Sequence, residues 1–159
     1  MQNNRGSHLP DATKRSTLIS RNDPFVSDQT NERLLALRVV MMPRDTNPHG
    51  TIFGGVILSY LDQAGAVCAY ESIRQAGFNR KPLVTVGMKS VEFHRPVFVG
   101  DVVSFWTKLV RLGNTSITIQ VEVEAERDGQ IEKLTEAEVS YVAFALQGAR
   151  RSPIPIKDE

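Results

Sequence analysis

Residues 54–77 read GGVILSYLDQAGAVCAYESIRQAG, and this stretch decides how the chain is organised. Apolar and small residues recur along it at close to 3.6-residue spacing, which is typical of a helix with one buried face. These residues are Ile57, Leu61, Ala64, Gly65, Cys68 and Ile73. Gly77 is suited to the position after the last helical residue, where glycine commonly takes the left-handed conformation. The sequence predicts one long helix of about six turns.

Strand patterns lie on both sides of this helix. Before it, residues 33–43 read RLLALRVVMMP, a short apolar run that ends at a proline and favours a first strand. After it come four segments rich in β-branched and aromatic residues, which strands favour. These segments are residues 83–93, 102–110, 116–126 and about 131–146.

The fourth of the five expected strands shows the clearest strand pattern. In SITIQVEVEAE (116–126), Ile117, Ile119, Val121 and Val123 alternate with polar residues, as one buried face requires. Asp128-Gly129 then favours a tight hairpin. Consecutive strands joined by short turns imply an antiparallel sheet. The sequence therefore predicts an α+β fold, with one helix against an antiparallel sheet.

Length and composition indicate one globular domain with tails. The chain has 159 residues, the size of a single domain. Residues 1–29 are polar with few large apolar side chains, so we expect a flexible N-terminal tail. We expect the domain to occupy residues 30–147. Residues 148–159, which include Pro153 and Pro155, are expected to form a C-terminal tail.

Charge, cysteine content and hydropathy exclude several functional classes. The net charge of +1 argues against a nucleic-acid partner. The single cysteine, Cys68, allows no intrachain disulfide and suits a reducing compartment. The N-terminus lacks the apolar run of a signal peptide, and no run of about 18 apolar residues predicts a membrane span. We therefore expect a cytoplasmic protein with no membrane partner.

Motifs for common cofactors and nucleophiles are missing. The sequence has no G-x-S-x-G elbow, phosphate-binding loop, dinucleotide fingerprint, H-E-x-x-H or C-x-x-C. Three histidines and one cysteine are scattered, which argues against a structural zinc site. We expect no cofactor and no metal, and the candidate residues gather between positions 45 and 62.

Gly54 and Gly55 stand where the helix is expected to begin. Glycine weakens a helix, and a plain tight turn would explain the pair. The alternative is a functional site: the first N–H groups of a helix have no internal partner and point outward. Such groups would stabilise the oxyanion that forms when a thioester carbonyl is attacked.

Asp62 is a carboxylate on an otherwise apolar stretch of the helix. If buried without a partner it would be costly, and desolvation would suit it to act as a general base. Alternatively, it shares an exposed stripe with Gln63. The loop before the helix holds Asn47, which either makes ordinary turn contacts ahead of Pro48 or orients a reactant. His49 and His94 are possible bases, although neither has a carboxylate partner nearby in sequence.

Taken together, these residues resemble the hotdog-fold acyl-CoA thioesterases, in particular the bacterial YciA type. The likeness covers about residues 33–146. It is carried by the D-T-N loop at 45–47, the F-G-G helix start at 53–55, the L-D-x-A-G helix motif at 61–65 and the turn F-x-R-P-V-x-V-G-D at 93–101. The resemblance implies a sheet wrapped around one central helix, and homodimers that often assemble as trimers of dimers into hexamers.

The resemblance also implies a function and a site. The substrate would be a fatty acyl-CoA, and the products a free fatty acid and CoA. Asp62 would be the essential acid, as general base or nucleophile, with Asn47 as its partner, while the N–H groups of Gly54 and Gly55 would polarise the carbonyl. Many relatives have histidine where this chain has Phe53, which leaves the role of His49 open.

An anionic CoA requires cationic and N–H donors. The candidates are Lys89, Ser90, Arg95, Arg111, Gly113, Asn114, Thr115, Ser116, Arg150 and Arg151, each of which is alternatively a solvated surface residue. Candidates for the acyl tunnel are Val56, Ile57, Tyr60 and Met88.

Helix geometry places Gly55 and Asp62 about 10.5 Å apart along the axis, too far to act on one thioester. We infer that each site combines the helix start of one chain with Asp62 of another. Two other functions stay open: a hydratase or dehydratase that uses His49 or His94, and a non-catalytic acyl-CoA binding module.

Overall fold

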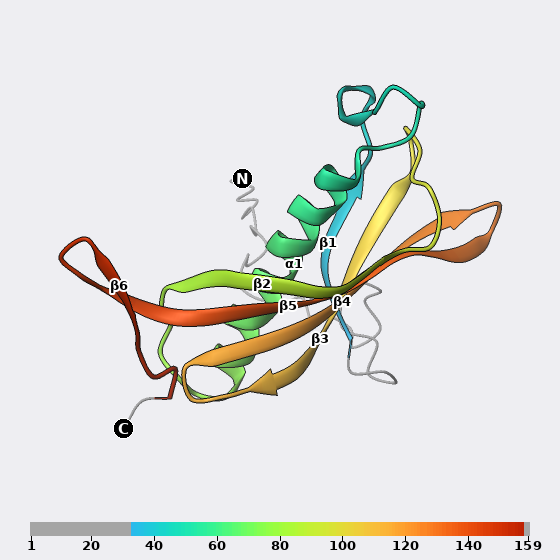
Figure 1. The fold of residues 1–159 in the computed structure, drawn as a ribbon. Coiled ribbons are helices and arrows are strands. Elements are labelled where there is room, and N and C mark those ends of the chain that lie inside the picture. The colour runs from blue at the N-terminus through green and yellow to red at the C-terminus, as the bar shows by residue number, and fades with distance from the viewer. Residues whose placement is uncertain (1–32, 158–159) are drawn as a thin grey trace, which may run out of the picture.

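The computed structural model describes residues 33–157, so the expected N-terminal tail at 1–29 lies outside the described part. The elements run in the order β1 (Leu34–Val40), a 3-10 turn η1 (Pro43–Asp45), α1 (Gly54–Gln75), β2 (Leu83–Phe93), β3 (Val102–Leu112), β4 (Ser116–Arg127), β5 (Gln130–Gln147) and β6 (Arg150–Pro153). Figure 1 shows α1 lying along one side of a strongly twisted sheet.

The strands form one antiparallel sheet in the order β1-β3-β4-β5-β2, and β6 adds to β5. The helix packs against β3, β4, β1 and β5. The predicted α+β architecture of one helix on one antiparallel sheet is therefore confirmed.

The buried face of α1 is the one that the spacing predicted. Ile57, Leu61, Ala64, Gly65, Cys68 and Ile73 are all buried, and Ala69 joins them. Beyond the helix, Gly77 has a φ of +80° and donates its N–H to the carbonyl of Arg74, which confirms it as the capping glycine. Among residues 33–157, no helix combines the length and the apolar content that a membrane crossing needs.

Strand β4 and its hairpin also follow the prediction. Ile117, Ile119, Val121 and Val123 are fully buried, while the residues between them are partly exposed. Asp128 and Gly129 both have positive φ, 51° and 74°, as the two central residues of a type I′ hairpin turn must.

The C-terminal segment packs on the domain, where we expected a tail. Strand β6 pairs with residues 144–147 of β5. Beyond it, the N–H of Ile156 donates to the carbonyl of Asn114 at 2.7 Å, and the Ile156 side chain is fully buried. The two prolines suggested loose chain, but proline is tolerated on an edge strand, and the apolar Ile156 two residues after Ile154 supplies the packing.

Strand β2 is an edge of the sheet and carries two irregularities. Its register with β5 shifts between Thr85 and Gly87 and again between Lys89 and Glu92, where Ser90 has a φ of +54°. Bulges twist an edge strand and redirect its side chains. The first of them follows directly after Thr85, which contacts the helix.

Candidate active site

Asp62 is a partly buried carboxylate with a specific partner. Its Oδ1 accepts a hydrogen bond of 2.6 Å from the Oγ1 of Thr85 on β2. Its main-chain carbonyl accepts a second one of 2.7 Å from the hydroxyl of Tyr141 on β5. The position of Asp62 lies between the two alternatives that the sequence left open, because its side chain is neither fully buried nor on an exposed face of the helix.

Thr85 and Tyr141 were not singled out from sequence, yet they are direct partners across β2 and β5. The available signal was a hydroxyl between Val84 and Val86 in an apolar strand. Tyr141 is 2% exposed, and burial, together with the nearby Asp62 charge, raises the pKa of its phenol. Tyr141 therefore stays protonated and acts as a hydrogen-bond donor at neutral pH.

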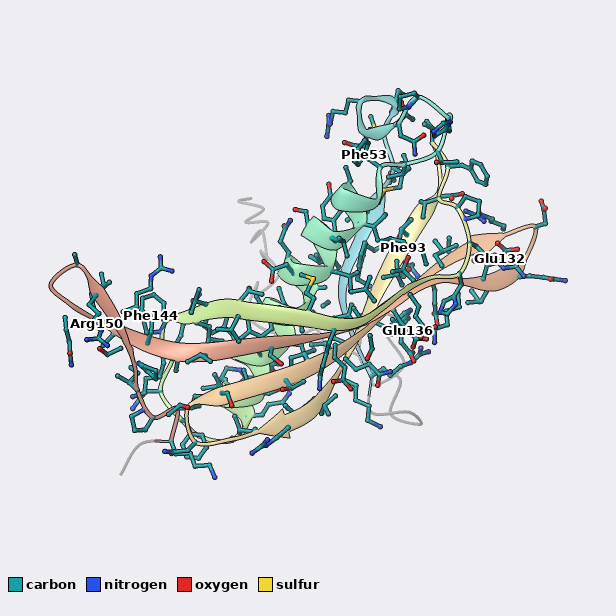
Figure 2. All side chains as sticks on the ribbon, in the orientation of Figure 1. Phe53, Phe93, Glu132, Glu136, Phe144 and Arg150 are labelled. Carbon is teal, nitrogen blue, oxygen red and sulfur yellow. The ribbon has the colours of Figure 1, made fainter. Side chains whose placement is uncertain are left out.

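The start of α1 is open to an incoming group. Phe53 is the N-cap in extended conformation and gives no side-chain hydrogen bond to the helix. Two shallow cavities flank this end, one of about 310 Å³ that Gly54, Phe93 and Arg95 help to line, and one of about 390 Å³ lined in part by Gly55 and Phe53. Figure 2 shows Phe53 at the helix start, with Phe93 on the adjacent end of the sheet.

Neither glycine at this point is demanded by packing within the chain. A Cβ on Gly54 would lie 3.5 Å from the Phe93 ring, and one on Gly55 would lie 3.7 Å from Phe53, both ordinary contacts. The N–H groups at a helix start nevertheless have no intrahelical acceptor. Two bare glycines leave these donors accessible to a carbonyl oxygen from outside.

Asn47 organises the loop before the helix. Its Oδ1 accepts hydrogen bonds from the N–H groups of His49 (2.9 Å) and Thr51 (3.3 Å), and its Nδ2 donates to the Oγ1 of Thr51 at 2.8 Å. These are the turn contacts that asparagine commonly makes. Within one chain its amide oxygen is already occupied by the loop.

One chain does not bring all the predicted catalytic groups together. Gly54 approaches Phe93 at the end of β2, whereas Asp62 contacts Thr85 near the beginning of the same strand. The helix start and Asp62 therefore lie over different parts of the sheet, in keeping with the spacing of about 10.5 Å along the helix.

The candidate CoA ligands divide into separate groups. On β2 and just beyond it, Lys89 pairs with Glu138 (3.0 Å) and Arg95 with Glu132 (3.1 Å), while Ser90 is exposed at a bulge. Arg150 lies at the β6 end, remote from Phe53 and Phe93 (Figure 2). Arg151 covers the Phe144 ring at 5.2 Å.

The β3–β4 turn forms a further group. Arg111 is exposed there, but the turn's own main chain is largely engaged: Gly113 donates its N–H to Ser116, and the carbonyls of Asn114 and Thr115 accept from Ile156 and Ala143. Of the main-chain N–H groups in this turn, that of Gly113 is therefore engaged within the chain.

The acyl-tunnel candidates lie near the first turns of α1 and on β2. Val56 and Tyr60 line the same cavity as Gly55, and Ile57 lines the cavity next to Gly54. Met88 on β2 is partly buried against the core.

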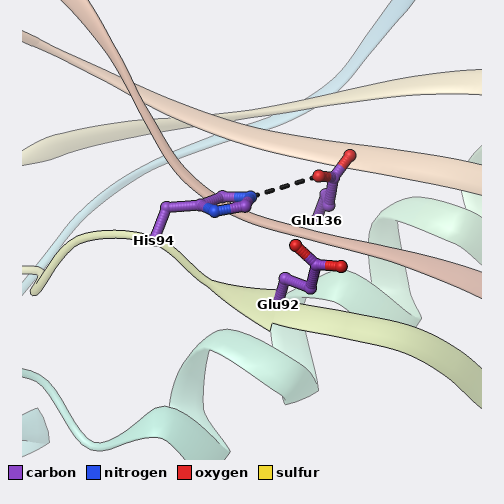
Figure 3. Close-up of side chains that lie close together, drawn as sticks. All are labelled: Glu92, His94 and Glu136. Atoms are coloured by element: carbon purple, nitrogen blue, oxygen red, sulfur yellow. Dashed lines mark hydrogen bonds and ion pairs between the residues drawn. The ribbon is translucent and has the colours of Figure 1, made fainter.

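His94 has a carboxylate partner that sequence proximity did not reveal. Its Nε2 lies 3.1 Å from Oε1 of Glu136, and Glu92 is beside them (Figure 3). Within residues 33–157 these three are the one group whose ligand atoms could hold a metal ion. The Lys133 ammonium already contacts Glu136 at 2.7 Å, so a cation is present at the cluster. Glu136 lies between the buried Thr135 and Ala137 in β5, so it points to the sheet face opposite the core, and it holds His94 away from Asp62 of the same chain.

Solved structures share this architecture. A hexameric hotdog fold thioesterase of Campylobacter jejuni is 42% identical, with a TM-score of 0.63 over 76% of this chain and 89% of that chain. A hexameric thioesterase from Yersinia pestis is 37% identical, with a TM-score of 0.64 over 76% of this chain and 94% of the other. The fold is therefore the hotdog fold, with the helix as its centre.

Sequence comparisons agree with the structural ones. The family model described as the thioesterase superfamily matches residues 49–132. This range includes the end of the loop that Asn47 organises, together with α1 and β2. The acyl-CoA thioester hydrolase YciA of Salmonella typhimurium is 41% identical over 135 residues, covering 82% of this chain and 96% of that protein. The chain belongs to the thioesterase superfamily, and it is an enzyme of the thioester hydrolase class.

Proposed function

We propose that the protein hydrolyses fatty acyl-CoA to a free fatty acid and CoA, with Asp62 as the general base. The observation that carries this proposal is the Asp62 carboxylate itself, partly buried on an otherwise apolar helix and held by Thr85 at 2.6 Å. A relative that matches most of the chain bears the name acyl-CoA thioester hydrolase.

In the proposed reaction, Asp62 takes a proton from a water molecule whose oxygen attacks the thioester carbonyl. A tetrahedral intermediate forms, and its oxyanion is stabilised by the N–H groups of Gly54 and Gly55. The intermediate collapses by breaking the carbon–sulfur bond. CoA leaves as a thiolate that takes the proton held by Asp62, which regenerates the carboxylate, and the acyl group leaves as the free acid. Asn47 supports the loop that carries the attacking water and the helix start.

The separation of the helix start from Asp62 leads us to propose a site between subunits. The edge strand β2 offers free main-chain groups for pairing with a second copy. In such a dimer Asp62, which β2 holds through Thr85, lies close to the partner chain. Two related structures are described as hexameric, so we propose a trimer of these dimers.

Release of free thiol from acyl-CoAs of graded chain length tests the function directly. We expect steady turnover with at least one acyl-CoA, measured by a thiol-reactive dye, and one equivalent of free acid for each thiol. Enoyl-CoA hydration, followed through loss of enoyl absorbance, should be undetectable. Binding of acyl-CoA without thiol release would instead indicate a binding module.

Recognition of the nucleotide is a second part of the proposal. Lys89, Arg95, Arg111, Arg150 and Arg151 are all exposed and can reach phosphate groups outside their own chain. Salt screens such ion pairs. A higher salt concentration should therefore increase KM for acyl-CoA more than KM for the matching acyl-pantetheine, which lacks the nucleotide. An equal increase for both substrates would show that these cations do not read the nucleotide.

A further inference from the structure

We propose that Tyr141 is a positioning residue for Asp62: its hydroxyl fixes the helical main chain at the residue whose carboxylate reacts. This inference rests on the proposed role of Asp62 in thioester hydrolysis. Nothing in the sequence motifs that identify the family requires a hydroxyl at position 141, and the contact emerges only from the packing of α1 on β5.

Two hydroxyls from neighbouring strands hold Asp62 at two different points. Thr85 and Tyr141 face each other across β2 and β5. Thr85 donates to the side-chain Oδ1 at 2.6 Å, and Tyr141 donates to the main-chain oxygen at 2.7 Å. With the Tyr141 contact alone, the carboxylate could rotate about its own side-chain bonds. With the Thr85 contact alone, the helix backbone could shift relative to the sheet. Together they fix both.

The main-chain oxygen of Asp62 has room for this second donor. A helical carbonyl accepts the N–H four residues later, here from Ala66. A carbonyl oxygen has two lone pairs, so the Tyr141 hydroxyl can bond to the one that the helix leaves unused. The contact therefore ties the helix to β5 without breaking the helix.

Gly65 is the residue that permits the approach. A Cβ at this position would lie 2.3 Å from the Tyr141 hydroxyl oxygen and 3.2 Å and 3.3 Å from two of its ring carbons. Glycine weakens a helix interior, so its presence in mid-helix calls for a reason. The close passage of the Tyr141 hydroxyl on its way to Asp62 supplies one.

Burial keeps the contact intact. Tyr141 is 2% exposed, so its hydroxyl has little access to water. A buried hydroxyl without an acceptor would be strongly disfavoured. Burial also raises the phenol's pKa, so the donor proton is retained across the range of a hydrolysis assay.

The first test is Tyr141→Phe, which removes only the hydroxyl. We expect kcat to fall about tenfold, as small misplacements of reacting groups do, with KM for acyl-CoA unchanged. The matched control is Thr107→Val, because Thr107 is another buried hydroxyl that donates to a main-chain carbonyl, that of Leu34 at 3.0 Å, but away from Asp62. The control should lose thermal stability to a similar extent and keep its kcat.

Coupling between two substitutions gives the second test. Gly65→Ala should lower kcat by pushing the hydroxyl away from the helix. In the double variant Gly65→Ala/Tyr141→Phe the 2.3 Å clash is gone, and only the ring contacts at 3.2–3.3 Å remain. We therefore expect the double variant to have at least the kcat of Gly65→Ala alone, because both changes act on one contact.

The possible results separate a failure of the positioning role of Tyr141 from a failure of the proposed hydrolase function. If the wild-type protein releases thiol but Tyr141→Phe keeps the wild-type kcat, the positioning role is wrong and the hydrolase function stands. A kcat loss shared equally by Thr107→Val, or multiplicative losses in the double variant, would likewise overturn it. If the wild-type protein releases no thiol from any acyl-CoA, it is the proposed function that fails.

Discussion

Replacing Asp62 with asparagine is expected to reduce thiol release by roughly 10²–10⁴-fold, the contribution typical of a general base. The amide keeps the shape of the carboxylate, and its oxygen can still accept the hydrogen bond from Thr85. The contact from Tyr141 goes to the main chain, so the substitution leaves it in place. Initial rates with the preferred acyl-CoA, together with thermal melting of the variant, measure the effect.

The matched control is Glu71→Gln, the same chemical change on the same helix. Glu71 pairs with Arg74 on the helix surface, away from β2. This variant should retain wild-type turnover. A well-folded Asp62→Asn protein with wild-type kcat would remove Asp62 from the mechanism and with it the basis of the proposed chemistry.

Mixing two inactive subunits should restore activity if the site is shared. Asn47 and Asp62 lie at separate parts of one chain, so we place Asn47 and the helix start of one subunit opposite Asp62 of its partner. In a dimer of one Asn47→Ala and one Asp62→Ala subunit, one site carries both lesions and the other carries none. With random pairing about half of the dimers are mixed, so about a quarter of wild-type activity should return.

The measurement is thiol release by the co-expressed, purified mixture, with mixed dimers established by intact mass. Each variant purified alone is the control and should be inactive. The result is the same whether Asn47 acts on the reactant or only shapes its loop. In both cases the Asn47→Ala substitution damages the part of the site that the helix start of that subunit provides. Inactivity of confirmed mixed dimers would place both residues in one site within a single chain.

Much of the fold was predictable because it follows from local periodicity. The buried face of α1 and the alternation in β4 each reflect a single side packed on a core, and the structure places those residues as expected. The Asp128-Gly129 hairpin was predictable because few residue pairs tolerate two positive φ values in succession. By contrast, the packing of Ile156 depends on a contact with the distant β3–β4 turn.

The site was predictable only in part, for the same physical reason. Asp62 stood out as a charge among apolar neighbours. Thr85 and Tyr141 did not stand out, because their role depends on their being paired across β2 and β5. This pairing could not be derived from sequence, since the bulge after Thr85 shifts the register of the two strands. His94 has no carboxylate partner nearby in sequence, and the sheet supplies Glu136 from β5, a strand far along the chain.

The strand order has a consequence for the time course of folding. Strands β3, β4 and β5 are joined by short turns and can pair locally, whereas β2 can dock only on β5, which is made three strands later. Forming such non-local pairs is slow, because a long loop must close first. Thr85 and Tyr141 belong to the two strands of this late pairing. The two hydrogen bonds that hold Asp62 are therefore both formed only after β2 has paired with β5. A partly folded chain can have its helix and hairpins in place and still lack a working site.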